Sequence, residues 1–198
     1  MPCGRPGRSW VAEVKRLVVG MTGASGPQIG VTFLQVLREL GGLETHLVMS
    51  QAARKTIEVE MRRDPSEVEA LADVSYSPSD VGAAISSGSF LTIGMVVIPC
   101  SMRTLAGVAT GNSTDLLLRA ADVCLKERRK LVLVVRETPL SLIHIRNMET
   151  ATLAGATILP PVPAFYHQPT TIDDLLRHTA GKVLDQFGFE HDVFRRWT

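Results

Sequence analysis

Short apolar runs alternate along the chain with longer segments in which apolar residues recur at helical spacing. The short runs lie at residues 16–22 (RLVVGMT), 44–50 (ETHLVMS), 94–100 (GMVVIPC), 130–137 (KLVLVVRE) and 156–160 (ATILP). Helical spacing covers residues 28–40, 51–61, 104–111, 115–128, 141–155 and 171–188. Near-continuous apolar strands that alternate with helices indicate a parallel sheet covered on both faces. We therefore predict an α/β fold of three αβα layers with a mostly parallel sheet, Rossmann-like or flavodoxin-like.

The length of 198 residues suits one domain with a substantial core. Glycine and proline near the start predict a flexible N-terminal arm over residues 1–14, followed by a single domain over residues 15–198. The chain is 45% hydrophobic and 21% charged, with a net charge of +1. This balance is typical of a globular protein and argues against a nucleic acid or an anionic membrane as its main partner.

The cysteines Cys3, Cys100 and Cys124 are too widely spaced to form a metal-ligand pattern or a disulfide framework. We expect Cys100 and Cys124 to be packed, reduced thiols. No apolar run approaches the roughly 20 residues that span a bilayer, and the stretch MPCGRPGRSWVAEVK lacks the apolar core of a secretory signal. These features predict a cytoplasmic protein without a metal site or a membrane span.

Polar or glycine-rich clusters follow four of the predicted strands, at residues 20–25, 49–50, 99–104 and 136–139. The carboxyl ends of parallel strands share one edge of a sheet, and ligands of α/β sheets bind beyond that edge. The sequence therefore predicts a ligand site to which all four clusters contribute.

The first cluster, TGASGP, joins a predicted strand to a predicted helix. Glycines allow a ligand to approach the backbone, and free N–H groups at a helix start attract an anion. Ser25 is placed either to cap the helix or to donate to a phosphate or a ring nitrogen. The spacing departs from the dinucleotide pattern G-x-G-x-x-G, and Met49 and Ser50 stand where an acidic residue would bind a ribose. The cluster favours a mononucleotide such as FMN, with a tight serine-capped turn as the alternative.

The other clusters carry hydroxyl and charged groups. Ser101 and Thr104 lie at a helix start, where they offer hydroxyls to a ligand or form a capping pair. Arg136 and Glu137 end the most apolar strand, where they clamp an anion and move a proton or form a surface ion pair. Tyr166 is a candidate phosphate ligand, whereas the basic run KERRK (126–130) is typical of a solvated helix end.

Several motifs together resemble one known family. They are MTGASG, ETHLVMSQAA, ISSGSF, PCSMRTLAG, RAADVCLKERRKLVLVVRETPLS, IHIRNM and PPVPAFYHQP, in this order between Lys15 and Trp197. On these motifs the chain is identified as a member of the flavin prenyltransferase (UbiX/Pad) family. The resemblance implies an enzyme that joins the dimethylallyl group of dimethylallyl phosphate to N5 and C6 of reduced FMN, without a metal. It further implies that the prenylated FMN passes to a UbiD-type decarboxylase, and that the protein forms a homododecamer with flavin sites between subunits.

The resemblance also implies roles for individual residues. The implied FMN ligands are Gly23, Ala24, Ser25, Ser50, Ser101, Met102, Arg103, Thr104, Arg119 and Arg136. The implied ligands of dimethylallyl phosphate are Lys126, Glu137, Tyr166 and Lys182, and the implied catalytic residues are Ser25, Glu60, Lys126 and Glu137. The cations, Tyr166 and a protonated Glu137 would neutralise the departing phosphate, while the loop Ser86–Phe90 would exclude water. Position 182 is usually arginine in the family, and lysine keeps the charge but loses the two-pronged grip of a guanidinium.

Two other functions stay open from the sequence. An FMN-dependent cysteine decarboxylase of the same fold would carry a turn like Pro-Ala-Ser-Ala-Asn-Thr and a catalytic histidine early in the chain. Here the turn reads PCSMRT, and the first histidine, His46, lies inside a predicted strand. A non-catalytic flavin-carrying subunit of a decarboxylase would not require Lys126, Glu137 and Tyr166.

Overall fold

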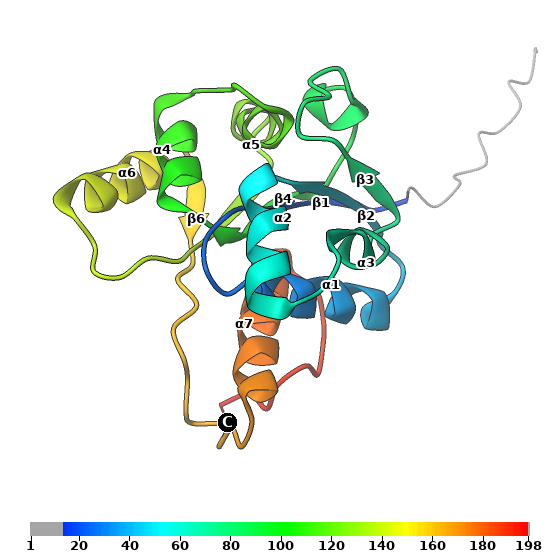
Figure 1. Cartoon of the computed structure of the whole chain (residues 1–198), viewed down its shortest axis with the longest axis vertical. Helices are drawn as coiled ribbons and strands as arrows, with labels where there is room; N and C mark the ends of the chain where they lie inside the picture. The colour runs from blue at the N-terminus through cyan, green and yellow to red at the C-terminus, as the bar shows by residue number, and fades with distance from the viewer. Residues whose placement is uncertain (1–13, 198) are drawn as a thin grey trace, which may run out of the picture.

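Six parallel strands form one sheet in the order β3-β2-β1-β4-β5-β6 (Figure 1). The structure is a computed structural model that describes residues 14–197. The strands are β1 (Arg16–Met21), β2 (Glu44–Met49), β3 (Val74–Tyr76), β4 (Gly94–Cys100), β5 (Lys130–Val135) and β6 (Ala156–Ile158). All neighbouring strands pair in parallel, which confirms the predicted parallel α/β sheet. The strand order is that of a Rossmann-type sheet, and it reverses between β1 and β4.

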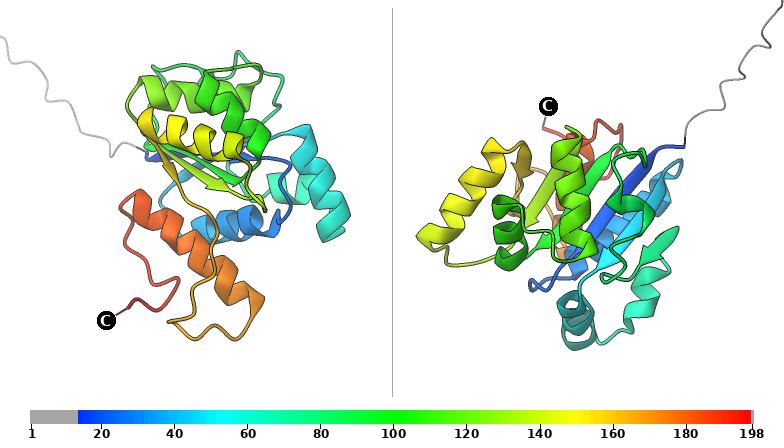
Figure 2. Two further views of the ribbon diagram at one scale, coloured as in Figure 1. Left: turned by 90° about the vertical axis from the view of Figure 1, so that its left-hand side faces the viewer. Right: turned by 90° about the horizontal axis from the view of Figure 1, so that it is seen from above.

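Helices cover both faces of the sheet, as the left view of Figure 2 shows. On one face lie α1 (Gln28–Leu40) and α7 (Ile172–Gln186), and on the other lie α4 (Met102–Thr110), α5 (Leu116–Lys126) and α6 (Leu142–Leu153). Shorter helical segments are α2 (Gln51–Thr56), a π-helical turn at Ile57–Met61, α3 (Pro65–Glu69) and a 3-10 turn at Ala84–Ser86. The predicted three-layer αβα architecture is therefore confirmed.

The structure differs from the sequence-based expectations mainly at residues 62–93. The sequence analysis predicts neither α3 nor β3, because both are too short to show a periodic apolar pattern. A capping box starts α3: the Asp64 side chain accepts from Ser66 N, and the Glu67 side chain accepts from Asp64 N. The flexible arm predicted for residues 1–14 lies, except for Val14, outside the described residues.

Two apolar layers pack the sheet between its helices. Successive side chains of β1 point to opposite faces, so Leu17 and Val19 join the layer under α1 and α7. Val18 joins the layer on the other side, with Leu117 of α5. The central strands β4 and β5 are buried along nearly their whole length, which explains their near-continuous apolar sequences.

Candidate functional site

A cavity of about 650 Å³ opens at the carboxyl ends of β1, β2 and β4. It lies where the strand order reverses, which is the position at which open α/β sheets bind ligands. The lining residues are Thr22, Gly23, Ser50, Gln51, Ala52, Pro78, Ser79, Val81, Ser101, Arg103, Thr104, Thr114, Asp115 and Leu118. The structure therefore brings Gly23, Ser50, Ser101, Arg103 and Thr104, half of the expected FMN ligands, to one cavity.

Three helices begin at this cavity. Their N-cap residues are Ser50 for α2, Ser101 for α4 and Asp115 for α5, and each side chain accepts a backbone N–H of the first turn at 2.9–3.3 Å. The capping pair considered for Ser101 and Thr104 is thus present, and both residues also face the cavity. Helix starts favour anions, and Arg103 adds a positive side chain. The cavity therefore suits a ligand that carries a phosphate.

Thr22 joins β1 to β4 at this cavity. Its hydroxyl donates to Pro99 O at 2.8 Å and accepts from Ser101 N at 2.8 Å. Its own N–H donates to Pro99 O at 3.2 Å, and the residue is 2% exposed. The sequence analysis does not identify Thr22 as a site residue, although its place directly after an apolar strand is a usable signal.

Five of the other lining residues that sequence reasoning misses come from two loops without a periodic pattern. Pro78, Ser79 and Val81 follow β3, and Thr114 and Asp115 precede α5. These loops approach one another because Leu116 N donates to Pro78 O at 2.9 Å. No local sequence signal indicates that contact.

The glycines of the first turn are required by packing against other parts of the protein. A Cβ atom on Gly23 would lie 2.4 Å from the Cβ of Ala52, and one on Gly30 would lie 2.4 Å from Ile98 O. Gly26 has a φ of +85°, which favours glycine. The glycines are therefore required not only for the approach of a ligand but also because the turn packs closely on α2 and α1 packs closely on β4.

Ser25 does not cap α1, so the capping role considered for it is wrong. The N-cap of α1 is Pro27, and no side chain caps this helix. Gly26 N donates instead to Glu60 Oε2 at 2.9 Å. This contact brings Glu60, from the π-helical turn, to the loop that carries Ser25.

Arg136 and Glu137 follow β5 at the same edge of the sheet. Arg136 N donates to Cys100 O at 3.1 Å, and the Glu137 carboxylate accepts from Thr138 N at 2.9 Å. Within residues 14–197, no ion pair joins Arg136 to Glu137, so the surface pair considered in the sequence analysis is not formed. Both side chains remain available to a ligand from outside the chain.

Lys126 and Arg119 border the loop Ser86–Phe90 rather than the 650 Å³ cavity. The Lys126 ammonium pairs with Glu127, and a Cβ on Gly88 would lie 2.8 Å from Lys126 Nζ. Arg119 Nε donates to Ser86 O at 3.2 Å. In this chain the loop therefore runs along α5, away from the start of the helix that lines the cavity.

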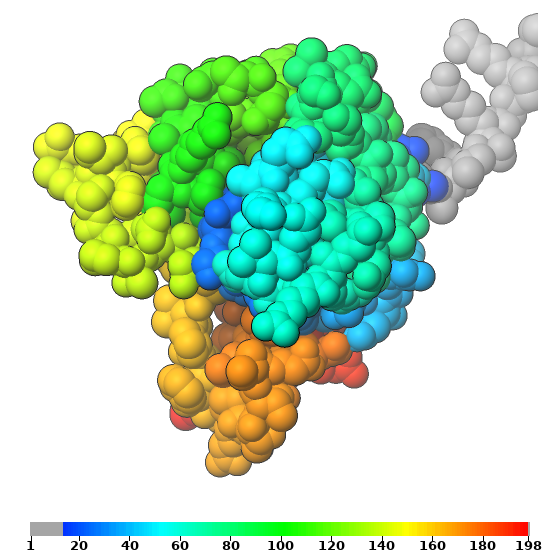
Figure 3. Space-filling model, in the orientation of Figure 1, coloured from blue at the N-terminus to red at the C-terminus, as the bar shows by residue number. Residues whose placement is uncertain are grey.

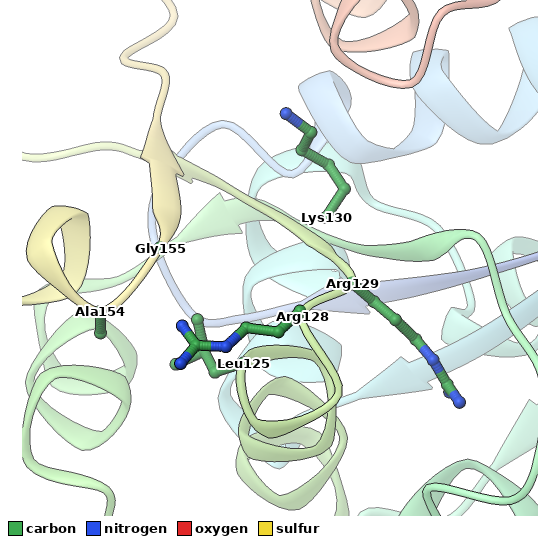
Figure 4. Close-up of a pocket in the computed structure, with 6 residues that line it drawn as sticks. All are labelled: Leu125, Arg128, Arg129, Lys130, Ala154 and Gly155. Atoms are coloured by element: carbon green, nitrogen blue, oxygen red, sulfur yellow. The ribbon is translucent and has the colours of Figure 1, made fainter.

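Three residues of the basic run, Arg128, Arg129 and Lys130, line a separate cavity of about 200 Å³ together with Leu125, Ala154 and Gly155 (Figure 4). Figure 4 shows Arg128, Arg129 and Lys130 pointing in three different directions. Arg129 donates to Phe90 O at 2.7 Å and to Gly88 O. Diverging cations do not form one anion site. The solvated helix end predicted from the sequence holds for Lys126, the exposed last residue of α5, while Arg128 and Lys130 are exposed beyond the helix and Arg129 anchors a loop.

Tyr166 lies beside α7, and Lys182 belongs to this helix. Tyr166, 40% exposed, has its hydroxyl 3.0 Å from His178 Nε2, and Lys182 pairs with Asp185 at 3.2 Å. Figure 3 shows α7 and the segment before it protruding from the body of the molecule. Among the described residues, the 650 Å³ cavity is lined by none of the expected donor ligands Lys126, Glu137, Tyr166 and Lys182. One chain therefore places its candidate residues in separate groups.

Two cysteines, Cys100 and Cys124, and the histidine His46 are buried within the protein. Burial raises the pKa of Cys100 and of Cys124 to about 12, so both are inert thiols at neutral pH, as predicted. His46 is 2% exposed and lies 2.7 Å from Glu44 Oε1 and 2.9 Å from the Tyr76 hydroxyl. Across residues 14–197, no group of three or more His, Cys, Asp or Glu residues is arranged to bind a metal ion, and no helix is long and apolar enough to cross a membrane.

The fold and the cavity define an α/β protein that binds a phosphate-bearing cofactor at the reversal point of a Rossmann-type sheet. In agreement, residues 10–183 match the family described as flavoprotein. The chain is 56% identical over 186 residues to the flavin prenyltransferase UbiX of Escherichia coli (strain K12), an alignment that covers 93% of this chain and 98% of that protein. The chain belongs to the family of UbiX flavin prenyltransferases.

Solved structures support this assignment. The crystal structure of AnUbiX (PadA1) in complex with FMN and dimethylallyl pyrophosphate superposes with a TM-score of 0.91 at 52% identity, covering 94% of this chain and 98% of that chain. The dodecameric FMN-dependent UbiX-like decarboxylase of Escherichia coli O157:H7 gives 0.90 at 56% identity, with 92% and 99% covered. The cysteine decarboxylase TvaF shares the fold alone, with a TM-score of 0.65 at 14% identity over 88% of this chain and 99% of that chain.

Proposed function

We propose that this protein transfers the dimethylallyl group of dimethylallyl phosphate to N5 and C6 of reduced FMN and releases inorganic phosphate. The observation that carries the proposal is the 56% identity to a flavin prenyltransferase over nearly the whole of both chains. The cavity at the sheet edge supports it, because its position and its three helix starts suit a phosphate-bearing flavin.

FMN fits the cavity in size and chemistry. The volume of about 650 Å³ falls within the range of roughly 300–1,000 Å³ that small-molecule sites occupy. Hydroxyls of Ser50, Ser101 and Thr104, backbone N–H groups at the start of α4 and the Arg103 side chain would bind FMN. The remaining proposed FMN ligands are Gly23, which also lines the cavity, and Ala24, Ser25, Met102, Arg119 and Arg136. Bound reduced flavin supplies the nucleophilic nitrogen and carbon.

The chain's own residues would neutralise the leaving phosphate. The donor's C–O bond breaks, and the electron pair leaves with the phosphate, so cations and hydrogen-bond donors at that point lower the barrier. Lys126, Lys182, Tyr166 and a protonated Glu137 are the proposed groups. The candidates for accepting the proton that C6 loses are Ser25 with either Glu60, which contacts the loop that carries Ser25, or Glu137.

Neighbouring subunits would complete this site. Lys126, Tyr166 and the cavity lie in separate groups within one chain. A similar protein is a dodecamer, and α6 carries the exposed apolar side chains Leu142, Ile143, Ile145 and Leu153. We therefore propose a homododecamer in which one subunit's cavity faces another subunit's phosphate ligands. The product, prenylated FMN, would pass in the cytoplasm to a UbiD-type decarboxylase.

A direct assay tests the proposed function. The purified protein is mixed with reduced FMN and dimethylallyl phosphate without oxygen, with dimethylallyl diphosphate in a parallel sample, and the flavin is analysed by mass spectrometry. We expect a gain of one C5H8 unit and release of phosphate. Lys126→Gln should abolish the gain while FMN stays bound. Lys130→Gln, which removes an exposed cation of the same basic run, is the matched control and should react normally.

The same assay separates the two alternative functions. A flavin that stays bound but unmodified, with either donor, would indicate a flavin-carrying subunit. Loss of carbon dioxide from a cysteinyl peptide would indicate a cysteine decarboxylase, to which the similarity is in fold alone.

A further inference from the structure

The Tyr166 hydroxyl has one hydrogen-bond partner within the described chain, the imidazole of His178. The distance from the hydroxyl oxygen to His178 Nε2 is 3.0 Å. Tyr166 belongs to the proline-rich segment after β6, and His178 to the middle of α7. His178 is 6% exposed, whereas Tyr166 is 40% exposed. The buried imidazole of His178 therefore contacts the hydroxyl of a tyrosine that is partly exposed to solvent.

Packing fixes the orientation of the His178 ring. His167 stacks on one face, with ring centroids 4.8 Å apart and an interplanar angle of 7°. Phe194 packs at 4.6 Å, and the Tyr166 ring meets the imidazole edge-on at 5.7 Å. A ring enclosed in this way does not swing, so Nε2 stays directed at the phenol. Trp197 holds Tyr166 from a further side, at 5.8 Å.

The surroundings of His178 favour the neutral form of its imidazole. Burial lowers its pKa below the ordinary value, the nearby His167 and Lys182 lower it further, and Asp185 opposes this shift. A neutral imidazole carries a proton on one nitrogen and a lone pair on the other. Nε2 can therefore either accept the phenol's proton or donate a proton to the phenol oxygen.

The single proton of a phenol limits what Tyr166 can do at one time. If that proton is donated to a phosphate oxygen, the contact with His178 persists only when Nε2 carries a proton and donates it to the phenol oxygen. The resulting chain runs from Nε2–H to the phenol oxygen and from its O–H to the phosphate. Each bond in such a chain polarises and strengthens the next.

We propose that His178 is a positioning residue that donates a hydrogen bond to Tyr166 and thereby orients its hydroxyl toward the phosphate of the prenyl donor. This inference rests on the proposed role of Tyr166 as a donor ligand. Lys182 strengthens the arrangement, because it lies one helical turn after His178 on the same face of α7. One helix therefore positions both the phenol and a cation.

The test compares two substitutions in the full-length protein loaded with oxidised FMN. In His178→Gln the side-chain amide can still donate to the phenol, whereas His178→Leu keeps the bulk and loses the donor. Calorimetric titration with dimethylallyl phosphate measures binding without turnover. We expect His178→Leu to raise the Kd about tenfold, as the loss of one charge-assisted hydrogen bond would. His178→Gln should stay within about twofold of the unchanged protein.

Kinetics and a double-mutant cycle distinguish positioning from a general structural role. In the prenylation assay His178→Leu should lower kcat/KM for the donor about tenfold, because the phenol that His178 orients also contacts the leaving phosphate in the transition state. In a Tyr166→Phe background, His178→Leu should add little to the Kd, because the group it positions is already absent.

Each outcome is informative about a different claim. Equal Kd values for His178→Leu and the unchanged protein, equal losses for Leu and Gln, or additive effects in the cycle would overturn the positioning role. Absence of donor binding by the unchanged protein would overturn both this inference and the proposed function. If the donor binds with the predicted coupling between His178 and Tyr166 but no prenylated flavin forms, the positioning role of His178 is supported and only the proposed function is contradicted.

Discussion

At the scale of single residues, buried polar side chains define the shape of the site. Thr22 lies at the reversal point of the sheet, and its hydroxyl bonds both a carbonyl and an N–H of the β4 exit. His178 acts in the same way on Tyr166. In both cases a buried side chain makes a hydrogen bond of 3.0 Å or less to a residue that faces a proposed substrate: Thr22 to Ser101 and His178 to Tyr166. The substrate-facing residues are therefore only part of what the site requires.

Replacing Thr22 with valine should destabilise the protein and weaken FMN binding. Valine keeps the shape but leaves Ser101 N unpaired in a buried place, which costs about 1–3 kcal/mol in the free energy of unfolding. Urea unfolding and a flavin fluorescence titration measure the two effects. Thr110→Val, at an exposed hydroxyl in α4, is the control and should change the stability by less than about 0.5 kcal/mol. An unfolding curve that coincides with that of the unchanged protein would contradict the role given to Thr22.

At the scale of elements, helix starts and loop anchors decide where functional groups lie. Ser50, Ser101 and Asp115 begin three helices at one cavity. A capping box of Thr171 and Asp174 starts α7, the helix that carries His178 and Lys182. Arg129 fastens the loop that borders Lys126. Within residues 14–197, these contacts fix the positions of helices and loops that form no hydrogen bonds with the strands of the sheet.

The start of α7 should lose stability in acid. Asp174 accepts from Thr170 N at 2.8 Å and from Thr171 N at 2.9 Å, and these backbone hydrogen bonds lower its pKa from 3.8 to about 2. Because the folded pKa is depressed, the stabilisation is present above pH 3.8 and is lost as the pH falls toward 2. Asp174→Ala should therefore lower the urea midpoint at pH 6, and the difference should shrink below pH 4.

Asp173→Ala provides the comparison for this prediction. Asp173 is an exposed acid in the same first turn, so its loss removes only a favourable interaction with the helix dipole. If the urea midpoint of Asp174→Ala stays below that of the unchanged protein by a constant amount down to pH 2.5, the carboxylate does not stabilise the helix through its ionised form.

The loop Ser86–Phe90 should become mobile without Arg129. Arg129→Ala leaves the carbonyls of Gly88 and Phe90 without their guanidinium donor. Hydrogen–deuterium exchange should then quicken in peptides that cover residues 86–93. Arg128, a neighbouring arginine whose side chain points elsewhere in Figure 4, provides the matched Arg128→Ala control. Equal exchange in both variants would mean that the loop is held by its other contacts.

At the scale of the whole molecule, one chain does not assemble the proposed reaction site. The cavity lies on the exit edge of the sheet, while α7 lies below the sheet in the left view of Figure 2 and protrudes from the molecule in Figure 3. On the opposite face, α6 buries Ala151 alone among its residues. Its leucine and isoleucine side chains are each more than half exposed. The homododecamer proposed above would account for both features.

A charge on α6 should disrupt the proposed oligomer. Ile143 is 70% exposed, and Ile143→Glu would bury a carboxylate wherever this face meets another subunit. Size-exclusion chromatography with light scattering should show smaller species, and prenylation should fall while the circular dichroism spectrum stays native. Val59→Glu adds the same charge at another apolar side chain, 64% exposed, and is the control. An assembly of unchanged mass would exclude this face as an interface.

Much of the fold was predictable because its signals are local. The strands of 16–22, 44–50, 94–100 and 130–137 are apolar runs that a buried parallel strand requires. The longer helices show their spacing within their own residues. The weakly periodic segment 62–93 was the part that such signals could not describe. Half of the expected FMN ligands lie at the exit edge because strand ends must meet there.

By itself, the sequence determined the alternation of strands and helices, the edge at which a ligand binds and the family, because periodicity and contiguous motifs are properties of neighbouring residues. The tertiary structure decided which distant residues meet. It brought Thr22 to Pro99, Glu60 to Gly26, Arg129 to the loop at Gly88 and His178 to Tyr166. Such contacts depend on how whole elements pack against one another, and this packing produces no periodic pattern in the sequence.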